Sequence, residues 1–137
     1  MKDKTSLLRS IAPALIAGAL YGSTFALSGL YLYDPKVSWT PVALFCAGAV
    51  VAFILGALSK SIGIAILSGF LLAFIAMIIL HLMFWVVAPA EADSFWGMLL
   101  WGVMYGLLFS TAGMLLSTIG HGAKLLFQAA RSKNRQA

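Results

Sequence analysis

The sequence predicts an all-α integral membrane protein, a bundle of four transmembrane helices, and two observations carry that prediction. Hydrophobic residues make up 62% of the 137 positions and charged residues only 9%, whereas a soluble domain has about 25% charged residues. The charges are also segregated, because the windows 10–33, 37–59, 61–90 and 94–123 contain none. Each window can hold the about 20 apolar residues that cross a bilayer as a helix. This composition excludes a soluble enzyme, a nucleic-acid-binding domain and a disordered tail.

The four windows predict one transmembrane domain over residues 1–137, with spans at about 10–32, 40–58, 62–88 and 95–119. The connections between them are short. Residues 33–39 form a turn in which Pro35 holds the preceding residue out of helical geometry. Residues 59–61 form a tight reversal, and Ser94 caps the fourth span after residues 89–93.

The end of the chain predicts a change in character after the fourth span. Gly120-His121-Gly122 is expected to loosen the helix, because glycine is a poor helix former. Residues 124–131 combine basic and apolar side chains, a pattern typical of a short amphipathic helix in the membrane interface. Residues 120–137 are therefore expected to form a basic cytoplasmic tail.

The distribution of Lys and Arg predicts the orientation of the bundle. Four spans place the N-terminus, the 59–61 turn and the C-terminus on one face, and Lys36 is the only basic residue on the other. The first face carries eight basic residues: Lys2, Lys4, Arg9, Lys60, Lys124, Arg131, Lys133 and Arg135. Because basic residues concentrate on the cytoplasmic side, both termini are expected there. The expected location is a bacterial inner (cytoplasmic) membrane.

A matching pattern of small and aromatic residues links the first and fourth spans, with five identities at a constant offset. Small residues at helical spacing allow close backbone approach in lipid, so these positions are the candidate helix-packing residues. The pattern in the first span is Gly18, Tyr21, Gly22, Phe25 and Gly29, and in the fourth Gly102, Tyr105, Gly106, Phe109 and Gly113. Convergence on one packing solution explains this 1–4 match better than a tandem duplication does.

His81 is the candidate ligand-binding or proton-binding residue, because it is an ionisable side chain well inside a charge-free window. It could bind a pigment, a haem or a metal, or act as a pH-sensitive gate. The favoured interpretation is structural, a neutral imidazole bonded to a carbonyl or to a hydroxyl of another span. Cys46 has a similar depth, which allows a weak Cys–His site, while His121 lies near the opposite face.

The spans contain no Asp, Glu, Lys or Arg, which are the usual marks of ion-coupled transport. We therefore expect a non-catalytic membrane subunit or oligomeric scaffold that packs against other membrane-protein subunits or itself. No catalytic residue, metal site, cofactor or nucleic-acid partner is predicted. The alternatives are a small homo-oligomeric transporter or channel with Tyr21, Tyr105 and His81 along a polar path, and a pigment- or haem-binding subunit that uses His81.

Overall fold

The computed structural model describes the backbone of residues 2–31, 39–87 and 94–134, and the side chains of residues 6–28, 43–86 and 94–134. The described residues form four α-helices. These are α1 (Lys2–Tyr31), α2 (Trp39–Leu58), α3 (Ile62–Val87) and α4 (Phe95–Asn134). The predicted turn at 33–39 and the connection at 89–93 lie almost entirely outside the described residues.

Three of the helices, α1, α3 and α4, are long and apolar enough to cross a membrane. The described apolar part of α2, Ala43–Leu58, is shorter. The all-helical fold predicted from the composition is therefore confirmed, and three of its helices have the length and apolar character that a membrane span requires.

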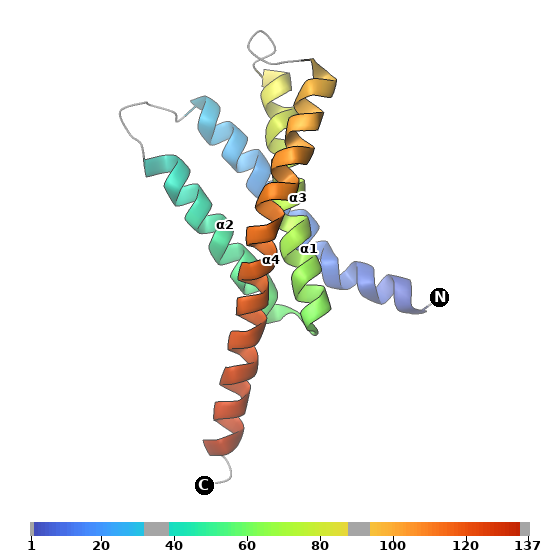
Figure 1. Ribbon diagram of the computed structural model, residues 1–137, viewed down its shortest axis with the longest axis vertical. Helices are drawn as coiled ribbons and strands as arrows, with labels where there is room; N and C mark the ends of the chain where they lie inside the picture. Colours follow the sequence, from blue (N-terminus) through green and yellow to red (C-terminus); the bar gives the residue numbers. More distant parts are fainter. Residues whose placement is uncertain (1, 32–38, 88–93, 135–137) are drawn as a thin grey trace.

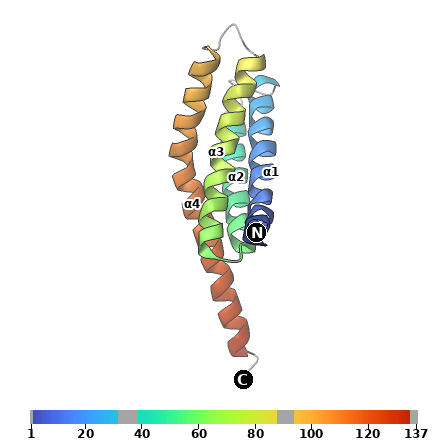
Figure 2. The same cartoon turned by 90° about the vertical axis from the view of Figure 1, so that its right-hand side faces the viewer.

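Helix α3 is the centre of the bundle. It packs against α4 on one side and against α1 on the other, and Figure 2 shows it between the two. α1 and α4 do not meet within the described part of the chain. The contact between α1 and α2 is sparse, although they are neighbours in sequence. In Figure 1 the ends of α1 and α2 near residues 31 and 39 diverge from the ends of α3 and α4 near residues 87 and 95.

The fourth helix differs from the prediction, because it runs without interruption from Phe95 to Asn134. The predictions of a separate interfacial helix and of a loosened segment at Gly120-His121-Gly122 were therefore wrong. Both glycines have ordinary negative φ angles, and Gly120 is buried against the α2 backbone. Tertiary packing there outweighs the poor helix propensity of glycine. The last turns of α4 consequently extend beyond the other helices (Figure 1).

One predicted chain reversal and one predicted helix cap agree with the structure. At the 59–61 turn, the Ser59 amide donates to the Gly56 carbonyl at 3.1 Å, which closes α2. The Ser61 hydroxyl accepts from the Ile64 amide at 3.4 Å at the start of α3. Ser94 caps α4 as predicted, because its hydroxyl accepts from the Gly97 amide at 3.2 Å.

Candidate functional site

The small-residue pattern of α1 packs against α3. A Cβ atom added at Gly18 would lie 2.9 Å from the Leu72 carbonyl oxygen, and one at Gly22 would collide with the backbone of Ala76. Phe25 is half-buried on the same helix. The surroundings of Gly29 lie outside the described side chains. The two glycines therefore bring the α1 and α3 backbones close together, as small residues do in membranes.

The matching pattern of α4 packs against α3 from the other side. Added Cβ atoms would lie 3.1 Å from Ile78 Cα at Gly102 and 2.9 Å from the Phe74 ring at Gly106, and would collide with the Gly69 backbone at Gly113. The two similar patterns thus share one partner helix and do not contact each other.

Two serines continue the buried face of α4 and bond it to α3. Ser110 and Ser117 are fully buried. The Ser110 hydroxyl is 3.1 Å from the Phe70 carbonyl oxygen and 2.6 Å from that of Gly106. The Ser117 hydroxyl donates to the Ala65 carbonyl at 2.7 Å. Sequence reasoning missed these residues, although their spacing from Gly106 and Gly113 continues the small-residue periodicity.

A second close approach, also missed, joins α2 to the C-terminal half of α4. A Cβ added at Gly56 would overlap the Ser117 backbone, and one at Gly120 would overlap the Phe53 carbonyl. One turn further along α4, Lys124 Nζ donates to the Ser59 carbonyl at 2.8 Å. The sequence did contain a signal for this contact between α2 and α4. Gly48, Ala52 and Gly56 follow one another at four-residue spacing on one helix face, which is typical of helix packing in membranes.

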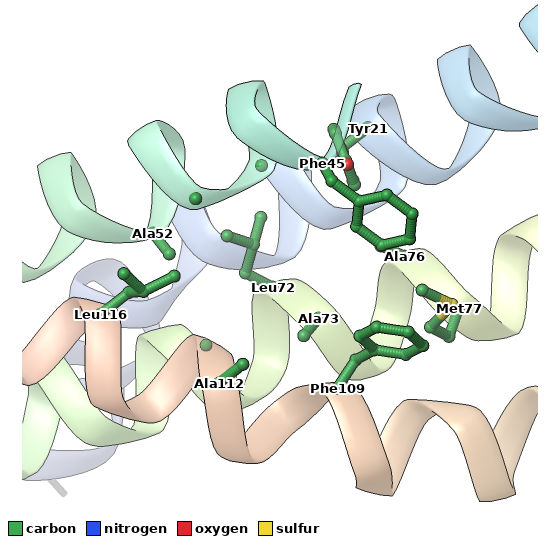
Figure 3. A pocket seen from close by; sticks show the side chains of 13 residues that line it. Tyr21, Phe45, Ala52, Leu72, Ala73, Ala76, Met77, Phe109, Ala112 and Leu116 are labelled. Atoms are coloured by element: carbon green, nitrogen blue, oxygen red, sulfur yellow. The ribbon is translucent and has the colours of Figure 1, made fainter. Parts of the chain in front are cut away.

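An apolar cavity of about 110 Å³ lies where α2, α3 and α4 meet Tyr21 of α1 (Figure 3). Of the residues that line it, only Tyr21 has a polar side-chain group, and its hydroxyl donates to the Leu44 carbonyl at 2.5 Å. The Phe45 ring stacks on that of Phe109 with centroids 5.6 Å apart. The cavity is therefore suited to apolar contacts, because its one hydroxyl proton is already donated within the protein.

His81 makes contacts that fit a structural role. Its Nδ1 lies 2.8 Å from the Met77 carbonyl oxygen, one turn earlier in α3. Because a carbonyl only accepts, Nδ1 carries the proton in this arrangement. The imidazole stacks on the Tyr105 ring at 5.6 Å, and Tyr105 stacks in turn on Trp101 at 5.7 Å. The structure thus joins His81 to Tyr105, whereas Tyr21 lies at the contact between α1 and α2.

The other candidate ligands are separated. His121 is buried, and its Nδ1 has no hydrogen-bond partner among the described residues. Cys46 is exposed on α2. Within the described ranges, no three His, Cys, Asp or Glu residues group closely enough to hold a metal ion.

Comparisons with known proteins add no functional assignment, since no protein-family model, curated protein or solved structure matches this chain.

The glycine contacts give a matched set of substitutions. We expect Gly22→Ala and Gly113→Ala to destabilise the bundle by about 1–3 kcal/mol, because the new methyl group meets backbone atoms that cannot move aside. Gly122→Ala, in open space on the same helix as Gly113, should stabilise it by about 0.5–1 kcal/mol. Unfolding of the three variants in mild detergent measures the difference. Equal stabilities would show that these close approaches do not support the fold.

The contacts of His81 predict a small effect of its removal. His81→Gln should unfold nearly as the unmodified protein does, and His81→Leu should cost about 0.6 kcal/mol, the average for a side-chain hydrogen bond in a bilayer. Thermal stability, bound metal and visible absorbance of the purified protein are the measurements. Loss of a bound metal or chromophore in both variants would instead identify His81 as a ligand.

Proposed function

We propose that this chain is a non-catalytic subunit or oligomeric scaffold of a bacterial inner membrane, which packs against other membrane helices through its own surface. Four spans and two cytoplasmic termini form part of the proposal. The projecting end of α4 is the observation that supports it most directly.

Helix α4 is longer than a bilayer requires. Its 40 residues correspond to about 60 Å at 1.5 Å per residue, whereas the hydrocarbon core is about 30 Å thick. Beyond the bundle it exposes three adjacent large side chains, Leu125, Leu126 and Phe127, at 52%, 74% and 69%. Because the hydrophobic effect favours covering such side chains outside the hydrocarbon, this segment is suited to contact another subunit.

The proposed orientation is supported by where the basic residues lie. Arg9 and Lys60 line one cavity, and Lys124 bonds to the carbonyl of Ser59 beside Lys60. Three elements therefore bring their basic side chains to one end of the bundle. Such an end is expected to face the cytoplasm.

Purification in mild detergent tests the assembly. We expect a mass larger than one chain, made up of a partner or of further copies. Leu126→Gln combined with Phe127→Gln should reduce this assembly without lowering thermal stability, because both side chains are exposed. Ala129→Gln, on the same segment, is the matched control. A single-chain mass would contradict the proposal, and ion or solute flux through a homo-oligomer in vesicles would favour the transporter alternative.

Cysteine labelling tests the orientation. In a Cys46→Ala background, Lys36→Cys or Asp93→Cys should react with a membrane-impermeant reagent added to intact cells, because both positions are assigned to the outer face. Tags at either end should react only after the membrane is opened. Labelling of an end tag in intact cells would reject the proposed topology.

A further inference from the structure

A second cavity, of about 560 Å³, lies between the first turns of α1, the end of α2 and the start of α3. This volume is within the about 300–1,000 Å³ of typical small-molecule sites. In contrast to the apolar cavity, its lining combines two cationic side chains, Arg9 and Lys60, with four serines, Ser6, Ser10, Ser59 and Ser68. Its chemistry is therefore that of an anion site.

The two cations reach the cavity from separate elements. Arg9 follows Ser6 by three residues on one face of α1, while Lys60 lies in the turn between α2 and α3. Like charges that face one cavity repel each other unless an anion lies between them. Within the described residues no carboxylate lines this cavity, and Asp3, six positions before Arg9, lies outside the described side chains.

Ser68 provides an independent observation. It is only 2% exposed, yet it lines the cavity. The hydroxyl of Ser59 donates to the Leu55 carbonyl and that of Ser10 to the Ser6 carbonyl, so the protons of these two hydroxyls are already used within the protein. Ser68 therefore adds a further hydroxyl to the cavity lining, and a hydroxyl can donate one hydrogen bond to a bound group.

Apolar side chains border the same cavity. Leu58, which lines it, is 73% exposed, and Pro13 and Ile64 also contribute to the lining. Three of the helices are long and apolar enough to cross a membrane. An exposed leucine beside a basic cavity therefore matches a ligand that has both an anionic group and hydrocarbon chains. A free inorganic anion would leave this apolar border without a contact.

We propose that this cavity binds the phosphate group of an anionic phospholipid. Arg9 and Lys60 pair with the phosphate charge, for which a guanidinium offers two parallel hydrogen bonds and an ammonium a compact positive charge. Ser68 donates a hydrogen bond to a phosphate oxygen, and the acyl chains lie along the apolar border. The proposal depends on membrane insertion and is independent of the scaffold function.

The test is native mass spectrometry of the full chain with added phosphatidylglycerol. The unmodified protein should retain one lipid molecule. Arg9→Gln combined with Lys60→Gln should weaken its binding at least about tenfold, and Ser68→Ala about two- to fivefold, as expected for the loss of a charge pair and of one hydrogen bond. Arg131→Gln combined with Lys133→Gln makes the same charge change at the exposed end of α4 and should leave binding within about twofold.

Three results would overturn the proposal. Equal weakening in the Arg131 and Lys133 control would show that net charge alone attracts the lipid. Phosphatidylcholine has the same phosphate group but no net charge, so its equal retention would show that the net negative charge of the lipid is not recognised. Displacement by millimolar inorganic phosphate would assign the cavity to a free anion. If the double variant does not fold, the single variants Arg9→Gln and Ser68→Ala decide between these outcomes.

Discussion

The architecture depends on how closely the backbones of neighbouring helices can approach. Lipid chains are as apolar as leucine, so helices in a bilayer gain little from hiding apolar side chains from each other. They associate through dispersion contacts, which require close packing, and through hydrogen bonds. In this chain both requirements are met mainly on α3, which receives the glycines of α1 on one side and those of α4 on the other.

Hydroxyl groups reinforce these contacts without introducing charge. Ser110 and Ser117 donate to carbonyls of α3, and Tyr21 donates to a carbonyl of α2. Each hydroxyl bonds to a carbonyl oxygen, which has a second lone pair beyond the one used in its own helix. The polar groups in these seams are thereby satisfied inside the protein, as the absence of water in the hydrocarbon core requires. Among the described residues, the buried Nδ1 of His121 is the exception, because it has no hydrogen-bond partner.

Much of the fold could be predicted from the sequence because apolar windows of membrane length leave few alternatives. The helices themselves, the reversal at residues 59–61 and the cap at Ser94 follow from local chemistry. The continuity of α4 does not, because the helix propensity of Gly120 is a local property while its packing against Phe53 is tertiary. The similarity of the two small-residue patterns also could not reveal that they share α3, since periodicity shows which face packs and not against what. The basic cavity combines residues of three elements, and nothing in the spacing of Arg9, Lys60 and Ser68 brings them together.

The sparse contact between α1 and α2 has a consequence for biogenesis. Because a chain is synthesised from its N-terminus, the α1–α2 hairpin is made before α3. That hairpin lacks most of its final neighbours, because α1 packs mainly on α3 and the close backbone-to-backbone approaches of α2 are to α4. If the chain is inserted in the order of its synthesis, α1 and α2 would remain loosely associated until α3 provides the surface on which α1 packs. The main partner of α2 would arrive only with α4.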